Sequence, residues 1–138
     1  MADAFDSVRF VLDYIEAAQR ARNTQSLEDM EALRRFLAPD VVIKMASPWT
    51  DMPWRVMTTS ADQLLQRFAA PINRGSSLTT ETVNAVKAAD DVLIEQISTV
   101  KRDDGREFVS IVCHIFSLKD GRISSVRTYR NDNGIPPG

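Results

Sequence analysis

The chain has only one cysteine, Cys113, and one histidine, His114, among its 138 residues. A single thiol excludes a disulfide within the chain, and a lone cysteine in an apolar run is typical of intracellular proteins. One thiol and one imidazole also fall short of the ligand set of a transition-metal site. Glycine-rich nucleotide loops and the common hydrolase and metalloprotease motifs are missing as well. We therefore expect neither a metal nor a cofactor.

The sequence also lacks an excess of charge and a long apolar run. Its 17 basic and 19 acidic residues give a net charge of -2, and it has no basic cluster that would attract nucleic acid or anionic lipid. No apolar segment approaches the roughly 18 residues of a membrane span. Residues 1–6 contain no basic stretch ahead of an apolar one, unlike a signal peptide. We expect a cytoplasmic protein that binds neither nucleic acid nor membrane.

Apolar residues recur with helical spacing in the first half of the chain. This spacing, with polar caps and the break at Pro39, predicts helices over residues 6–22, 26–38 and 59–70. A short strand is expected over 41–46. The following segment, 47–55, holds two prolines and both tryptophans, and is expected to be irregular.

The second half changes to the two-residue period of β-strands. Extended runs are predicted over residues 78–87, 92–101, 107–118 and 122–130. The pairs Asp104-Gly105 and Asp120-Gly121 indicate tight turns, which make neighbouring strands antiparallel. Residues 131–138 are expected to form a C-terminal tail.

Length and element order together predict one α+β domain over residues 1–138. Long, twisted strands curl, and without a second sheet the helices must cover the concave face. The expected fold is a cone-shaped, curved antiparallel β-sheet wrapped around N-terminal helices. Side chains need not fill such an interior, so we expect a pocket for a small-molecule ligand.

Several segments carry a family resemblance, and they occur in order over almost the whole chain. They are Phe36 to Val41, Val92-Leu93-Ile94-Glu95, Phe116 to Ile123 and Val126-Arg127-Thr128-Tyr129. Together they resemble the nuclear transport factor 2-like superfamily, and most closely its SnoaL-like and limonene-epoxide-hydrolase-like branch. The resemblance implies a cone-shaped fold that often dimerises. Its members include hydrolases, isomerases, cyclases, dehydratases and non-catalytic binding domains, so the fold does not fix the function.

Epoxide hydrolases of that branch use an Arg-x-Asp pair on a central strand and an aspartate in Arg-Asp-Tyr on the last strand. Depending on the alignment, this chain has Gln96 and Ser98, or Glu95 and Ile97, at the first two positions. Thr128 replaces the last aspartate. Neither alignment recovers the hydrolytic set, which argues against epoxide opening.

His114 is the first candidate catalytic residue. The resemblance suggests that Ser110, Val112, His114 and Phe116 face inward, where an imidazole can act as a general acid or base. A two-residue turn at Asp104-Gly105 would pair Glu95 with His114. A three-residue loop at 103–105 would instead place Gln96 and Ser98 on the face of His114. Both registers remain open.

Tyr14 is the other candidate catalytic residue, because a tyrosine on the first helix can polarise a substrate carbonyl, as in steroid isomerases of the superfamily. It is offset from the apolar stripe of Val8, Val11 and Ile15, which favours a surface position. The residues expected to line the pocket are Met45, Trp49, Trp54, Gln96, Ser98, Val112, Phe116 and Thr128.

Two functions fit these features. The first is cofactor-independent isomerisation, dehydration or cyclisation of a small apolar oxygenated molecule by acid-base chemistry. The alternative is a non-catalytic ligand-binding or dimerisation module. A homodimer is expected in either case, because Ile111, Cys113 and Ile115 would leave an apolar outer sheet face that needs covering.

Overall fold

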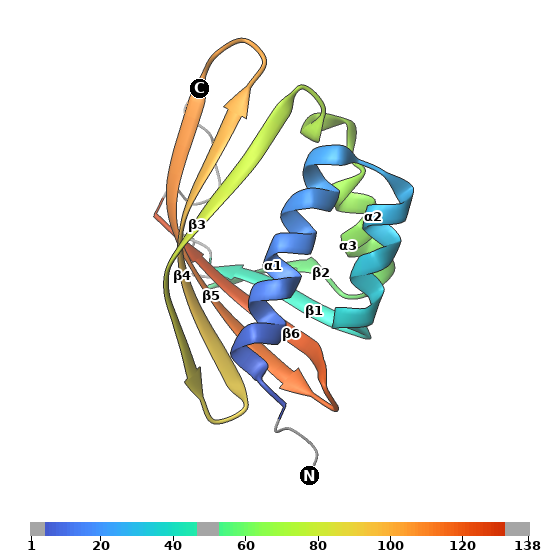
Figure 1. Cartoon of the computed structure of the whole chain (residues 1–138), viewed down its shortest axis with the longest axis vertical. Helices are drawn as coiled ribbons and strands as arrows, with labels where there is room; N and C mark the ends of the chain where they lie inside the picture. Colours follow the sequence, from blue (N-terminus) through green and yellow to red (C-terminus); the bar gives the residue numbers. More distant parts are fainter. Residues whose placement is uncertain (1–4, 47–52, 132–138) are drawn as a thin grey trace.

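The computed structural model describes residues 5–46 and 53–131, and Figure 1 shows its helices gathered on one side of a curved sheet. The elements, in chain order, are α1 (Ser7–Thr24), α2 (Leu27–Glu31), the 3-10 helix η1 (Ala32–Phe36), β1 (Leu37–Ala46), β2 (Trp54–Thr58), α3 (Ala61–Phe68), the 3-10 helix η2 (Pro71–Asn73), β3 (Ser76–Ala88), β4 (Asp91–Arg102), β5 (Glu107–Lys119) and β6 (Arg122–Arg130). The expected α+β class is confirmed.

The strands form one sheet in the order β2-β1-β6-β5-β4-β3. Strands β3 to β6 make the predicted antiparallel meander, whereas β1 pairs with β6 in parallel. A parallel pair is possible because a long stretch of chain separates β1 from β6 and leaves room for a crossover. The predicted antiparallel sheet therefore contains one parallel pair, between β1 and β6.

The region around Pro39 also differs from the sequence prediction. The second helix splits into α2 and η1 and stops at Phe36, and β1 begins at Leu37 with Pro39 inside it. The strand tolerates the proline because the β1–β6 register shifts between Leu37 and Val42, and an irregular stretch does not require the missing N–H. Strand β2 was not predicted, and its residues fall partly within the segment that was expected to be irregular.

Helix α1 begins at a polar cap and covers the sheet. The carboxylate of Asp6 accepts a hydrogen bond from the Arg9 backbone N–H at 3.0 Å, which satisfies a donor that the first helical turn leaves free. The helix contacts β3 and β4 and packs its inner side chains against the core. Among the described residues, no helix has the length and apolar character needed to cross a membrane.

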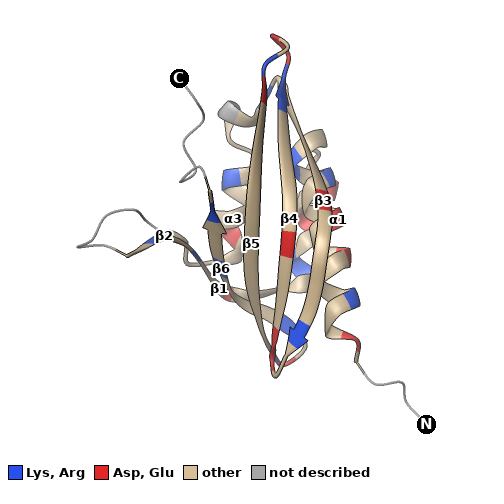
Figure 2. Ribbon diagram, turned by 90° about the vertical axis from the view of Figure 1, so that its left-hand side faces the viewer, with Lys and Arg blue, Asp and Glu red and all other residues tan. Residues whose placement is uncertain are grey.

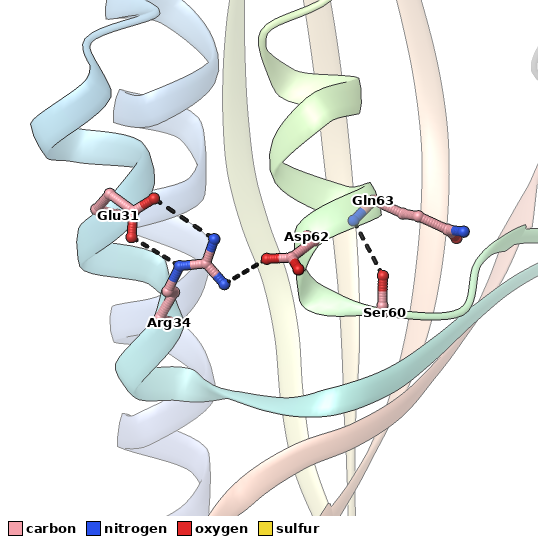
Figure 3. A network of polar contacts seen from close by, with 5 residues as sticks. All are labelled: Glu31, Arg34, Ser60, Asp62 and Gln63. Carbon is pink, nitrogen blue, oxygen red and sulfur yellow. Dashed lines mark hydrogen bonds and ion pairs between the residues drawn. The ribbon is translucent and has the colours of Figure 1, made fainter.

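A short polar network fixes the start of α3 against η1 (Figure 3). The Arg34 guanidinium lies 2.7 Å from a carboxylate oxygen of Glu31 and 2.7 Å from one of Asp62. The Ser60 hydroxyl accepts the Gln63 backbone N–H at 3.1 Å, which caps α3. Exposed ion pairs add little stability, so this network mainly orients α3, which supplies one wall of the interior.

The hydrophobic core lies between the helices and the sheet. Its completely or almost completely buried members include Val11, Leu33, Leu37, Ile94 and Ile123. Along the inner face of β4, the apolar residues Val92 and Ile94 are followed by Gln96 and Ser98, so the packed core gives way to a polar lining. This change positions the candidate site.

Candidate functional site

A cavity of about 710 Å³ lies between α1, α3 and the inner face of the sheet. Most of its lining is apolar, and the volume lies in the range typical of small-molecule sites. The apolar side chains of the lining are Ile15, Ala18, Ile43, Met45, Leu64, Phe68, Ala70, Leu78, Val100, Phe108, Val112, Phe116 and Val126.

The β4–β5 register decides which polar residues face this cavity. Arg102 pairs with Arg106 through a 2.8 Å hydrogen bond from Arg102 N to Arg106 O, which leaves a loop of three residues, 103–105. Gly105 adopts a φ of 90°, as expected for the left-handed position of such a loop. The second of the two open registers is therefore the observed one.

This register separates Glu95 from His114. Glu95 pairs with Cys113 and is exposed on the outer face, whereas His114 pairs with Ile94 on the inner face. The structure thus corrects the expectation that Glu95 orients the imidazole: a shift of one residue between the strands turns its side chain to the opposite face. Gln96 and Ser98 line the cavity together with His114.

His114 is held by a hydroxyl rather than by a carboxylate. Its Nδ1 lies 2.8 Å from the Thr128 hydroxyl oxygen, and the two residues are cross-strand partners in β5 and β6. Burial, and secondarily the positive charge of Arg130, lower the pKa of His114 from 6.5 to about 4. The imidazole is therefore neutral near pH 7, with one nitrogen able to accept a proton.

Tyr14 lies inside the molecule, so the surface position favoured by the sequence is wrong. Its ring packs edge-on against Phe36 and Phe116, with centroids 5.8 and 6.0 Å apart, and only 7% of the residue is exposed. The inward stripe of α1 is broader than predicted. Burial raises the Tyr14 pKa well above its usual value, so the hydroxyl keeps its proton and can donate it in a hydrogen bond.

Tyr14 and His114 lie at the same end of the cavity. The His114 and Phe116 ring centroids are 5.6 Å apart, so both rings contact Phe116, one from α1 and one from β5. An apolar surface thus separates a potential proton acceptor from a potential hydrogen-bond donor. Both side chains line the cavity.

Gln96 adds a buried amide to this lining. The residue is 2% exposed, and its Nε2 has no hydrogen-bond partner among the described residues. A buried donor left in this state costs free energy. Gln96 therefore has a hydrogen-bonding capacity that the described protein does not use.

Sequence reasoning missed several polar residues of the lining. Arg130 was not among the expected pocket residues, yet it lines the cavity and donates from Nη2 to the Ser110 hydroxyl at 3.2 Å. The two-residue period from Thr128 could have placed Arg130 on the inner face. Arg22 and Arg102 were also missed, since each lies near the end of its element.

The remaining predicted pocket residues divide into two groups. Met45, Val112, Phe116 and Thr128 line the cavity. Trp54 does not; it packs against Tyr129 at a centroid distance of 5.3 Å. The local reason is its pairing with Ala46 at the edge of the sheet. Trp49 falls within residues 47–52 and lies outside the described residues.

The chemistry available in the cavity is limited by residue type. No aspartate or glutamate occurs among the described residues that line it. The described part of the chain contains no group of three or more histidine, cysteine, aspartate or glutamate residues placed to hold a metal ion. The lining offers an imidazole, a phenol, hydroxyls, amides and guanidinium groups. Proton transfer and hydrogen bonding are within its reach.

The family comparison agrees with this architecture. The SnoaL-like domain family matches residues 11–126. The chain belongs to the SnoaL-like family. No curated protein matches its sequence.

Solved structures share the SnoaL-like fold with this chain at low sequence identity. An LEH-like epoxide hydrolase from M. tuberculosis is 16% identical with a TM-score of 0.64, and the match covers 92% of this chain and 86% of that one. A proposed SnoaL-like polyketide cyclase from Jannaschia sp. CCS1 is 13% identical with a TM-score of 0.67, covering 94% and 92%. TsrD from Streptomyces laurentii is 15% identical with a TM-score of 0.67, covering 95% and 94%. These likenesses establish the fold alone.

Proposed function

We propose that this SnoaL-like protein is a cofactor-independent enzyme that isomerises, dehydrates or cyclises a small, largely apolar, oxygenated molecule. The observation that carries the proposal is the neutral imidazole of His114, which borders an apolar cavity and is held by the Thr128 hydroxyl at 2.8 Å. Buried polar groups are normally hydrogen-bonded, and the Thr128 hydroxyl contacts only one of the two nitrogens of the His114 imidazole.

The proposed reaction begins with proton removal beside a carbonyl group. The free nitrogen of His114 takes the proton from the substrate C–H, and the bonding electron pair moves onto the carbonyl oxygen to form an enolate. The Tyr14 hydroxyl donates a hydrogen bond to this oxygen, since the raised pKa keeps the phenol protonated. His114 then returns the proton to another atom of the substrate, which isomerises it, or to a departing hydroxyl, which dehydrates it.

A proton-exchange assay tests this chemistry without the natural substrate. In heavy water, the protein should speed the exchange of the hydrogens beside the carbonyl of 2-tetralone, a small apolar ketone, as followed by NMR. His114→Ala should reduce the rate by a factor of roughly 100 or more, because general-base catalysis contributes about that much. Glu28→Ala changes an exposed side chain outside the cavity lining and serves as the control. Full exchange activity in His114→Ala would remove His114 from the mechanism.

The alternative is a non-catalytic ligand-binding module. It is favoured by the absence of carboxylates from the described cavity lining and by the low pKa of His114, since a weaker base abstracts a proton less readily. Saturable binding of 2-tetralone without faster exchange would support this alternative. Epoxide hydrolysis ranks last, because Gln96, Ser98 and Thr128 supply no carboxylate to activate water.

We also propose that a second copy of the chain covers the outer sheet face. Figure 2 looks onto this face of β4 and β5, where charged residues are sparse. Val109, Ile111 and Tyr129 are 60%, 55% and 40% exposed. An apolar sheet face of this kind is typical of a subunit interface.

A further inference from the structure

We infer that the ligand carries a carboxylate or a similar anionic group, which Arg22 and Arg102 bind at the end of the cavity remote from Phe116. This inference rests on the proposed ligand-binding function and names the class of molecule. Its chemical basis is that guanidinium groups favour planar oxyanions, to which they donate paired hydrogen bonds.

Arg22 is held in position by the start of β3. Its Nη1 donates to the Ser76 carbonyl oxygen at 3.0 Å, and its Nη2 donates to the Ser76 hydroxyl at 2.8 Å. The side chain is half-buried, and burial lowers its pKa from the usual value. An arginine nevertheless stays charged at neutral pH, so a positive charge is fixed at this end of the cavity.

Arg102 brings a second positive charge to the same place. It is the cross-strand partner of Ser76 in the β3–β4 ladder, and the Cβ atoms of such partners lie only about 5 Å apart. Its Nε is buried and has no hydrogen-bond partner among the described residues. Arg22 has a structural role in joining α1 to β3, but that role does not explain the unused donor of Arg102.

Carboxylates near these arginines do not face the cavity. Asp103 and Asp104 belong to the exposed β4–β5 turn, and Asp104 bonds Arg106, with 2.9 Å between Arg106 Nε and a carboxylate oxygen. Within the described lining, four arginines occur without any aspartate or glutamate: Arg22, Arg67, Arg102 and Arg130.

The charged residues of the described lining are all basic, whereas the chain as a whole has 17 basic and 19 acidic residues. Charges of one sign in a recess bordered by apolar walls attract ligands of the opposite sign. The apolar lining toward Phe116 would take the body of the same molecule. The cavity is therefore suited to an amphipathic anion with its charged group at the arginine end.

Two fluorescent probes with almost the same aromatic body test the inference. 8-Anilino-1-naphthalenesulfonate carries one negative charge, and N-phenyl-1-naphthylamine is neutral. We expect the wild-type protein to bind the anionic probe more tightly, with an affinity that falls as salt is added. Arg102→Gln should weaken the anionic probe roughly tenfold, because a hydrogen bond to a charged group is lost, and should leave the neutral probe unchanged.

Matched variants separate the possible results. Lys101→Gln removes an exposed charge beside Arg102 and should change neither affinity, while Ser98→Trp should fill the cavity and abolish binding of both probes. Arg22→Gln should act like Arg102→Gln, and retained binding of the neutral probe shows that the variant is folded. If the neutral probe binds and Arg102→Gln leaves the anionic probe unaffected, the anionic site is refuted while the ligand-binding function stands. If neither probe binds the wild type, both are refuted.

Discussion

The pH dependence of stability gives a direct test of the environment of His114. In the folded protein the pKa of His114 is lowered to about 4, first by burial and then by the charge of Arg130. In the unfolded chain an ordinary pKa of about 6.5 is restored. Between these values the unfolded state binds more protons than the folded state, so the free energy of unfolding decreases as the pH falls.

The size of the effect follows from the two pKa values. The full shift of about 2.5 units corresponds to roughly 3 kcal/mol, at about 1.4 kcal/mol per unit. About 2 kcal/mol of this should be lost between pH 7.5 and pH 5, a window above the ordinary pKa of the carboxyl groups. The loss should become complete only below about pH 3, where the folded state is protonated as well.

Urea unfolding at pH 7.5 and pH 5 measures the difference, with His114→Gln as the control. The variant keeps a polar side chain but cannot titrate, so its stability should change much less over this window. Because His114 is the only histidine in the chain, one NMR signal from labelled imidazole reports its pKa without ambiguity. A titration midpoint near 6.5 in the folded protein, or an equal loss of stability in His114→Gln, would refute the burial of the imidazole.

Two further predictions concern Gln96 and the outer sheet face. Gln96→Met should raise the free energy of unfolding, measured by chemical denaturation, by about 1–2 kcal/mol, because it removes a buried amide whose Nε2 is unpartnered among the described residues. The same substitution should weaken the binding of an oxygenated ligand. A destabilised variant would instead show that the Gln96 amide is satisfied in the folded protein. The wild-type protein should have the mass of a dimer in light scattering. Ile111→Lys replaces an apolar residue that is 55% exposed with a charged one, and it should shift the protein toward the monomer. A monomeric wild type would exclude the proposed interface.

The sequence predicted the antiparallel meander well because its signals are local. The Asp-Gly pairs mark the β4–β5 and β5–β6 turns, and the two-residue period marks the strands between them. The turn sequence Asp103-Asp104-Gly105 is compatible with two loop lengths, however, and each gives a different register. The choice depends on the pairing of Arg102 with Arg106 across the loop, which no local pattern determines.

Tyr14 and Trp54 show a second limit of sequence reasoning, which is the width of the face that an element buries. Helix α1 buries Ser7, Val11, Tyr14 and Ala21, a stripe that includes a residue outside the most apolar line. The width of this buried stripe is determined by the sheet strands that pack against α1, and these strands are far from the helix in the sequence. Trp54 was expected in the pocket because of its size and apolar character, but its edge strand places it against Tyr129 instead.

The inner face of β4 connects stability with function in this fold. Its first inward residues, Val92 and Ile94, are completely buried and belong to the core, while Gln96 brings a buried amide donor that the described protein leaves unpaired. Continuing the apolar pattern through position 96 would have strengthened the core. A ligand that accepts a hydrogen bond from Gln96 would offset the cost of burying this donor and stabilise the folded state. The polar half of β4 is therefore best explained by a bound molecule, because packing alone favours a different sequence there.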